Sequence, residues 1–381
     1  MKLHMKKSKL RKNNHISDRV QNIQYSSVRK SFAAGAAKEM INATIGRPDF
    51  DVPDKIKEQA KLHIDLGHNA YTETKGILSL REAISKHLLT RNIKRSSDEV
   101  LVSSGTTSSI FMVIASLINP GDEVIIFEPY FVAYPEVVKM FGGTCVVLKT
   151  TNEFQPDIDL LEKSVTGKTK LIIVNSPNNP TGAVYSQESI KSIVKIARKT
   201  GVHILSDEIY HDFLYDKEVH YSPAEIYSKT IVVDGLSKSK GMSGWRIGFI
   251  AGPKKIIDAV EKVQQFTSVC APTPFQYASV STFADPLSPD ILAQYKQKRD
   301  LLIDGIKNYY DVVVPKGAFY LFIRTPMNTT RFSEILSKKG LAVVPGSAFG
   351  EYKNFIRISY AIHNEEITKM IKTLLDAVKE K

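Results

Sequence analysis

Cysteine is scarce in this sequence and long apolar runs are absent, and each absence excludes a class of protein. Only two of the 381 residues are cysteine, Cys145 and Cys270, which make neither a disulfide framework nor a metal-site spacing. No apolar run approaches the ~20 residues that a membrane-spanning helix requires. Polar residues follow the basic start of the chain where the apolar core of a signal peptide should lie. We therefore expect a cytoplasmic protein with reduced thiols, no metal and no membrane contact.

Negative charge is missing from the start of the chain, and this changes how the net charge is interpreted. The formal net charge of +12 would be typical of a nucleic-acid-binding protein. However, half of this excess comes from basic residues that precede the first acidic residue. They are Lys2, Lys6, Lys7, Lys9, Arg11 and Lys12. No other basic block interleaved with aromatic residues follows, so nucleic acid is not an expected partner.

The middle of the chain alternates between apolar runs of strand length and segments with helical periodicity. The runs are residues 99–103, 123–127, 170–175, 202–206, 230–234 and 246–251, and the helical segments are residues 108–118, 187–200 and 254–266. This alternation is typical of an α/β protein whose mostly parallel sheet is covered by helices on both faces.

The pattern changes after about residue 286, and a chain of this length can hold more than one hydrophobic core. The later segments are a long amphipathic helix at 291–310, short strands at 318–323 and 355–360, and a helix at 331–339. They indicate a separate α+β unit. The predicted parts are an N-terminal segment (1–45) that packs with the small domain or reaches toward a partner subunit, a large domain (46–285) and a small domain (286–381).

Polar or glycine-rich sequences follow several predicted strands, and ligands of doubly wound sheets bind at the carboxyl ends of strands. Residues 103–108 (SSGTTS) lead directly into an apolar helix, where backbone N–H groups and a positive helix terminus suit a phosphate. An ordinary helix N-cap would look the same. Residues 175–182 (NSPNNPTG) hold Asn179 on a turn that two prolines rigidify, although turn chemistry alone would also explain the prolines.

Charged residues in three further segments need partners. Asp207 follows a very apolar strand, with Tyr210 three residues later, and a buried carboxylate normally has a cationic partner, which is not near in the sequence. Lys238 follows one apolar run and Arg246 begins the next, which would place both at the same edge of the sheet, although a solvated lysine pair is the alternative. Arg357 lies within a strand pattern, where an arginine more often makes an ion pair than binds a ligand.

Together these segments resemble the class I and II aminotransferases of fold type I, which are enzymes that use pyridoxal 5′-phosphate (PLP). The resemblance runs from residue 44 to residue 357 in the family's order and is closest to the subgroup of aspartate and aromatic aminotransferases. Further matching segments are residues 44–50 (TIGRPDF), 71–76 (YTETKG), 119–124 (NPGDEV), 129–131 (PYF) and 317–320 (GAFY). The resemblance implies a mostly parallel seven-stranded sheet with helices on both faces, plus a smaller α+β domain.

The resemblance also implies which residues carry the chemistry. Lys238 would hold PLP as a Schiff base and would then move a proton between the substrate α-carbon and the cofactor, tasks for which an amine needs a lowered pKa. Asp207 would keep the pyridine nitrogen protonated, and that nitrogen would be its missing cation. Tyr210 and Asn179 would hydrogen-bond the phenolic oxygen of the cofactor.

The remaining cofactor contacts implied by the resemblance surround the ring and the phosphate. Phe131 would stack on the ring, and Tyr71 would reach the phosphate bound by the neighbouring subunit, which implies a homodimer with composite active sites. The phosphate would be bound by Gly105, Thr106, Thr107, Ser237 and Arg246. The family often has serine where this chain has Gly235, so the contact of Ser237 depends on a shift along the chain.

The implied substrates are an amino acid, with aspartate or an aromatic amino acid favoured, and a 2-oxo acid such as 2-oxoglutarate. Arg357 would bind the substrate α-carboxylate through two parallel hydrogen bonds, helped by Asn179 and by the backbone of Gly46. Arg47 could favour an acidic substrate side chain, or it could be a surface arginine before a proline turn. These alternatives stay open.

Two other functions compete with transamination. A β-lyase or an enzyme like aminocyclopropane-carboxylate synthase would keep the fold and cofactor, and a lyase would release pyruvate and ammonia from cysteine conjugates without a 2-oxo acid. A PLP-binding regulatory protein would need a preceding DNA-binding domain, for which the residues before Thr44 are too few.

Overall fold

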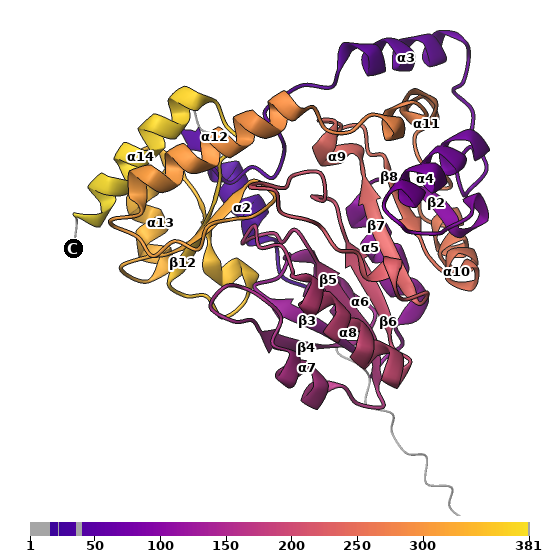
Figure 1. Cartoon of the computed structure of the whole chain (residues 1–381), viewed down its shortest axis with the longest axis horizontal. Coiled ribbons are helices and arrows are strands. Elements are labelled where there is room, and N and C mark those ends of the chain that lie inside the picture. Colours follow the sequence, from indigo (N-terminus) through magenta and orange to yellow (C-terminus); the bar gives the residue numbers. More distant parts are fainter. Residues whose placement is uncertain (1–15, 22, 36–39, 380–381) are drawn as a thin grey trace, which may run out of the picture.

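The computed structural model describes residues 16–21, 23–35 and 40–379. The basic residues from Lys2 to Lys12 therefore lie outside the described residues. Figure 1 shows a large sheet surrounded by helices and, beside it, a smaller group of strands and helices formed by the C-terminal part of the chain. In the described part of the chain, no helix combines the length and the apolar character needed to cross a membrane.

The large sheet has seven strands, in the order β2-β8-β7-β6-β5-β3-β4. They are β2 (Val100–Ser103), β3 (Glu123–Glu128), β4 (Thr144–Lys149), β5 (Thr169–Asn175), β6 (His203–Asp207), β7 (Thr230–Gly235) and β8 (Gly248–Ala251). All are parallel except β8, which is antiparallel to both of its neighbours. This confirms the predicted fold class, and the six predicted runs all form strands. The edge strand β4 was not among those runs.

Both faces of this sheet are buried, which explains why its strands are apolar without alternation. In β5, Leu171 and Ile173 enter one hydrophobic cluster, whereas Ile172 and Val174 enter another on the opposite face. Each such side chain contributes about 1.5–3 kcal/mol when fully buried. The first face is covered by α5 (Thr106–Leu117), α6 (Ala133–Met140) and α10 (Lys254–Gln265), and the second by α4 (Leu78–Thr90), α7 (Ile158–Ser164), α8 (Gln187–Thr200) and α11 (Thr273–Ser279). Helix α3 (Asp54–Asp65) packs against α11.

Capping residues explain why the predicted helix 187–200 forms with those bounds. The side chain of Ser186 accepts a hydrogen bond from the backbone N–H of Ser189, which satisfies one of the free donors at the helix start. Gly201 follows the helix with φ +76°, a conformation that glycine adopts without steric cost.

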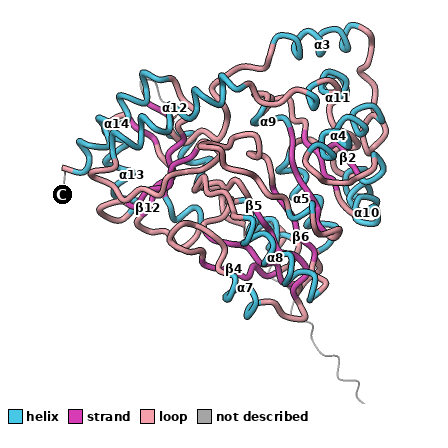
Figure 2. The backbone as a smooth tube through the Cα atoms, viewed as in Figure 1, coloured by secondary structure: helices cyan, strands magenta, loops and turns pink. Residues whose placement is uncertain are grey.

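The smaller group of elements contains the three-stranded antiparallel sheet β11-β12-β9. Its elements are α12 (Pro289–Ile306), β9 (Tyr320–Arg324), α13 (Thr329–Lys338), β11 (Val344–Pro345), β12 (Phe355–Ser359) and α14 (Asn364–Val378). Figure 2 shows these strands separated from the large sheet. The N-terminal segment joins this group because β1 (Ile41–Asn42) pairs with β10 (Leu341–Ala342). The other described helices are α1 (Asp18–Gln21), α2 (Ser27–Ala34) and α9 (Leu236–Ser239).

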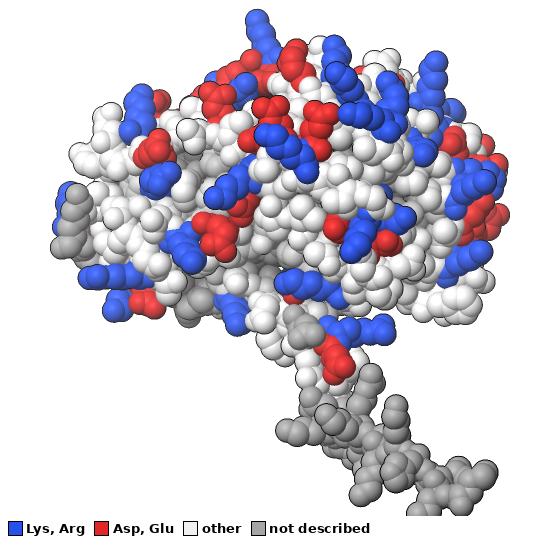
Figure 3. Space-filling model, turned by 90° about the horizontal axis from the view of Figure 1, so that it is seen from below, with Lys and Arg blue, Asp and Glu red and all other residues white. Residues whose placement is uncertain are grey.

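The topology brings one end of several strands to the same edge of the large sheet. The carboxyl ends of β2, β3, β5, β6 and β7 point the same way, and the antiparallel β8 begins at this edge. Most of the predicted site residues therefore converge there, since they end or follow these strands or precede β8, whereas Gly46, Tyr71 and Arg357 come from other parts of the chain. On the face drawn in Figure 3, acidic and basic side chains are interspersed.

Candidate active site

A cavity of about 130 Å³ lies at this edge of the sheet, and it contains most of the predicted site residues. Nine predicted residues line it: Gly46, Thr106, Thr107, Phe131, Asn179, Asp207, Tyr210, Lys238 and Arg357. Five further residues, which were not predicted, complete the wall: Val28, Ile110, Asn175, Ile209 and Tyr320. The remaining predicted residues, Tyr71, Gly105, Ser237 and Arg246, do not line this cavity.

Lys238 reaches the cavity from α9, the short helix that follows β7 directly. Its Nζ donates a hydrogen bond to the backbone oxygen of Gly46 and lies 5.6 Å from the ring centre of Tyr210. Burial lowers the pKa of the Lys238 amine to about 8, and the positive charge of Arg357 contributes to the shift. The amine is thus partly unprotonated near neutral pH, and it is then competent as a nucleophile or a base.

Asp207 is the last residue of β6 and is buried. Its Oδ2 accepts a hydrogen bond of 2.7 Å from the hydroxyl of Tyr134, and its Oδ1 accepts one of 3.4 Å from the backbone N–H of Ile209. Burial raises the pKa of Asp207 to about 6. No ion pair joins this carboxylate to a cation within the described part of the chain. A cationic ligand group beside it would compensate for its burial.

Asn175, the last residue of β5, and Asn179, on the turn that follows it, connect Asp207 to Arg357. The Asn175 amide donates to the backbone oxygen of Asp207 at 3.0 Å, and its side-chain oxygen accepts from the Asn179 N–H at 3.0 Å. Arg357 Nη1 donates to Asn179 Oδ1 at 2.9 Å, and Nη2 donates to the backbone oxygen of Thr44 at 2.7 Å. Arg357 Nε is buried without a hydrogen-bond partner among the described residues. The guanidinium is therefore held in place with donor capacity left for an anion.

Two phenols meet on another wall of the cavity. The hydroxyl groups of Tyr210 and Tyr320 lie 2.7 Å apart, and burial raises the pKa of Tyr210 well above its usual value. Tyr320 also limits the space beside Gly46, because a Cβ at position 46 would lie 2.9 Å from the Tyr320 hydroxyl. A glycine at this position therefore permits the close approach of residues 44–46 to the site.

Small residues allow a tight cradle between β2 and α5. Gly105 has φ +84°, and a Cβ there would lie 2.7 Å from Cζ of Arg246. A Cβ on Gly248 would lie 2.9 Å from the backbone N of Thr106. Arg246 donates to the backbone oxygens of Ser104 (3.1 Å) and Ser243 (3.0 Å) and is exposed. A helix N-terminus beside a guanidinium suits an anion, and the phosphate expected here stays a prediction.

Ser237, Phe131 and Tyr71 differ in how they relate to the cavity. The Ser237 hydroxyl is buried and has no hydrogen-bond partner among the described residues, so it is available to a ligand. Phe131 lines the cavity and packs edge-on against Tyr134, with ring centres 5.6 Å apart. Tyr71 is 82% exposed and lies away from the cavity of its own chain.

The sequence did not single out Tyr134, Asn175, Tyr320 or Val28 as site residues. Tyr134 is 73 positions from Asp207 along the chain, so no local spacing could indicate their contact. Asn175 belongs to the segment 175–182 that the sequence analysis discusses. Its place at the end of an apolar run, before two prolines, is the signal that could have identified it. Val28 belongs to α2, which carries no motif. Only the packed fold brings these side chains to the cavity.

The chain matches the family model "Aminotransferase class I and II" over residues 38–374. It is 36% identical to aromatic-amino-acid aminotransferase 2 of Thermococcus litoralis, covering 96% of this chain and 99% of the relative. It is 35% identical to the aspartate aminotransferase of Thermotoga maritima, covering 95% and 98%. The structure of aspartate aminotransferase from Thermus thermophilus with maleate superposes with a TM-score of 0.91 at 33% identity, covering 95% and 99%. The resemblance stated from the motifs is confirmed, and this chain belongs to the aminotransferase class I and II family.

Proposed function

We propose that this aminotransferase uses PLP to transfer the α-amino group of aspartate or an aromatic amino acid to a 2-oxo acid such as 2-oxoglutarate. The observation that carries the proposal is the meeting of Lys238, Asp207 and Arg357 in one cavity. These residues provide an amine with a lowered pKa, a buried carboxylate that forms no ion pair with any described residue, and a guanidinium with donor capacity left for a ligand. The relatives are named as aminotransferases, so the comparisons give no support to the lyase alternative.

The unsatisfied groups of the cavity fit PLP. Asp207 suits a protonated ring nitrogen, because that cation would offset the burial that raises the pKa of the carboxyl group. The glycine cradle, Arg246 and the orphaned hydroxyl of Ser237 suit a phosphate. Phe131 would face the ring, with Asn179 and Tyr210 at its phenolic oxygen. When bound, PLP supplies an electron-accepting ring that stabilises negative charge at the substrate α-carbon.

The chain's own groups would then bind and orient the amino acid and move its proton. The Lys238 Nζ would hold the cofactor. After the amino group of the substrate displaces it, the free amine would remove the proton from the substrate α-carbon and deliver it to the cofactor. Arg357 would fix the α-carboxylate, with Asn179 and the Gly46 backbone beside it. This fixation keeps the α-proton within reach of the amine, which is the main contribution of positioning to the rate.

The preference for aspartate or an aromatic amino acid rests on the names of the relatives. Arg47 does not line the cavity and is exposed, so the proposal assigns it no substrate contact. Val28, Ile110 and Ile209 add apolar surface to the wall, which is compatible with an aromatic side chain.

The proposal includes a homodimer with composite active sites in the cytoplasm. Tyr71, which lies outside its own cavity, would reach the phosphate of the partner's cofactor. The exposed apolar side chains of Leu62, Ile64 and Leu66 on and beside α3 support a partner surface near Tyr71. The division into residues 1–45, 46–285 and 286–381 is part of the same proposal, and the pairing of β1 with β10 supports grouping the first segment with the last.

Absorption spectroscopy of the purified protein with PLP tests the proposed function. Addition of a true amino-acid substrate should shift the visible band to the near ultraviolet, and a 2-oxo acid should restore it. Aspartate, glutamate and phenylalanine, added in turn, would rank the substrates. A protein that binds no PLP would contradict the proposal, and a bound cofactor that no amino acid shifts would refute transamination of these substrates.

Replacing Arg357 with lysine should raise KM for every amino-acid substrate by about 10- to 100-fold, because lysine keeps the charge but loses the paired hydrogen bonds, worth about 1.5–3 kcal/mol. Steady-state kinetics with two amino acids of different side chains provide the measurement. Arg324→Lys is the matched control, since Arg324 lies on the neighbouring strand β9 and is exposed. Unchanged KM values in Arg357→Lys would refute the carboxylate assignment.

A further inference from the structure

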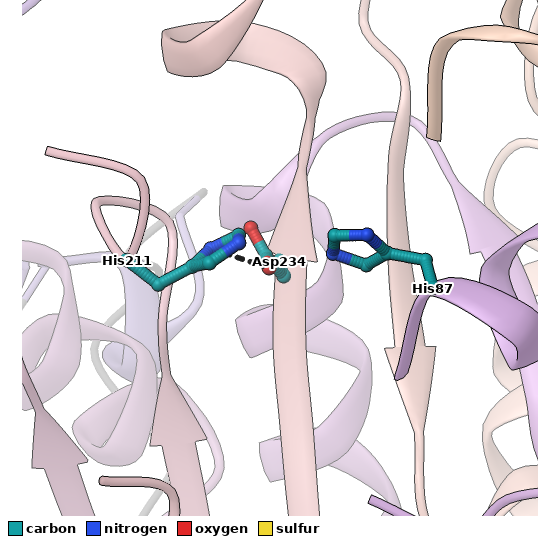
Figure 4. A group of neighbouring side chains, drawn as sticks. All are labelled: His87, His211 and Asp234. Atoms are coloured by element: carbon teal, nitrogen blue, oxygen red, sulfur yellow. Dashed lines mark ion pairs between the residues drawn. The ribbon is translucent and has the colours of Figure 1, made fainter. Parts of the chain in front are cut away.

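Two histidines and an aspartate meet on the side of α9 that faces away from the active-site cavity. His87 comes from α4, His211 from the loop after β6, and Asp234 from β7. One potential ligand atom from each lies within 4.8 Å of those of the other two. Figure 4 shows the two imidazole rings on opposite sides of the Asp234 carboxylate. Imidazole nitrogens and a carboxylate are ligands that zinc and related transition metals prefer.

The histidine nitrogens have unused capacity for a ligand. Neither ring nitrogen of His87 has a hydrogen-bond partner among the described residues, so the ring can turn toward an ion without losing a bond. Nε2 of His211 is buried and no described residue hydrogen-bonds to it, while Nδ1 lies 3.0 Å from both the backbone oxygen of Glu208 and Oδ2 of Asp234. A histidine that donates through one nitrogen presents the lone pair of the other to a metal.

The charges around the cluster favour a cation. Arg91 pairs with Glu208 and Asp234, and His211 pairs with Asp234 and Asp212. Three carboxylates therefore share one guanidinium in this network. Oδ1 of Asp212 lies 3.4 Å from Nε2 of His211, which places a fourth oxygen ligand within reach. A divalent ion would offset the excess of negative charge.

The cluster is accessible through a cavity of about 810 Å³, whose wall includes His87, His211, Asp212 and Asp234. The two lysines on this wall are Lys86 and Lys240. The amine of Lys240 donates to the backbone oxygens of Asp285 and Pro286, and so it does not pair with the three carboxylates. The volume allows entry of a hydrated ion, and it is separate from the cavity that contains Lys238.

We propose that His87, His211 and Asp234 bind a divalent transition metal such as Zn²⁺, with Asp212 or water as the fourth ligand. No spacing in the sequence indicates such a site, because its ligands come from three separate segments of the chain. A metal here would join α4 to the ends of β6 and β7 and would stabilise their packing, since binding to the folded state alone raises stability.

Metal binding by the tag-free holoenzyme, treated with a chelator and dialysed to remove free PLP, tests the proposal. Equilibrium dialysis against Zn²⁺ should give one ion per chain, and Co²⁺ should give the visible d–d bands of a low-symmetry site. His87→Phe removes the donor atoms while keeping a ring against Phe283, and it should weaken binding by at least about tenfold. His363→Ala, which removes an exposed histidine at the start of α14, should bind as the unmodified protein does.

Thermal unfolding provides a second readout. Zn²⁺ should raise the midpoint of the unmodified protein and of His363→Ala but leave that of His87→Phe unchanged. The metal-free midpoints show whether each variant folds, and His87→Ala replaces His87→Phe if the larger ring is not accommodated. Absence of Zn²⁺ binding by the unmodified protein, or equal affinity in the His87 variants, would overturn the proposal.

Discussion

A Lys238→Ala variant should lose at least about 10³-fold in kcat/KM for transamination, and its PLP absorption band should no longer be that of a lysine-bound cofactor. Proton transfer by a positioned side chain is worth about 10²- to 10⁴-fold, and Lys238 is the one lysine among the described residues that line the cavity. Burial lowers the pKa of this amine to about 8, so its loss removes both the attachment point and the base. Absorption spectra and steady-state turnover with the best amino acid measure the two effects.

Lys240→Ala is the control for this variant. Lys240 lies two residues further along, and its amine donates to backbone oxygens outside the active-site cavity. The Lys240→Ala variant should retain the absorption band of lysine-bound PLP and the turnover of the unmodified protein. If Lys238→Ala also retained both, another amine would have to hold the cofactor and the assignment would be wrong.

Asp207→Asn should reduce kcat by at least about 100-fold, because an amide cannot hold a proton on the ring nitrogen by charge. PLP should still bind, since the phosphate cradle and Lys238 are intact. Rapid-mixing absorption measurements of the amino-acid half-reaction would show the loss in the proton-transfer step. Tyr134→Phe is the matched control: it removes the hydroxyl that donates to Asp207 but keeps the carboxylate, so a smaller loss is expected. A kcat unaffected by Asp207→Asn would contradict the proposed role.

The same substitution should change how the stability of the cofactor-free protein depends on pH. Burial raises the pKa of Asp207 from 3.8 to about 6. Between these values the unfolded state ionises first, so the free energy of unfolding falls as pH rises, by about 3 kcal/mol for a shift of this size. Asp207→Asn should lack this part of the decline. Denaturant titrations of both proteins at pH 4 and pH 7 provide the comparison.

The large sheet could be predicted because its strands are buried on both faces and are therefore continuously apolar. The edge strand β4 lacks that signal: it has one neighbour, and Thr144, Val147 and Lys149 are exposed. The bounds of α8 were predictable from Ser186 and Gly201, whereas α12 ends four residues before the predicted end at 310. The helical spacing of apolar residues continues beyond Ile306, where the α12 backbone ends, so the sequence pattern places the end of this helix too late.

The part of the candidate site that lies at the ends of strands could be predicted from the sequence. Asp207, Asn179 and Lys238 each follow an apolar run, and the parallel topology brings such positions together. The family resemblance was needed to assign their roles, because spacing alone left an N-cap, a turn or an ion pair as alternatives. Contacts such as Tyr134 with Asp207 and Tyr210 with Tyr320 depend on the packing of side chains from distant segments. The role of Tyr71 depends on a second chain, and no single sequence contains that information.

Arg357 and Thr44 are 313 positions apart, and this separation fixes the order in which a nascent chain can assemble the site. The seven-stranded sheet has all its strands once the ribosome has passed Ala251, and domains fold as they emerge. Lys238, Asp207 and Asn179 are then already present, whereas Arg357 and the β10 partner of β1 have yet to be translated. On the proposed assignment, a translation product that stops before Arg357 could capture the cofactor but could not bind a substrate carboxylate, so turnover begins only after residue 357 has been translated.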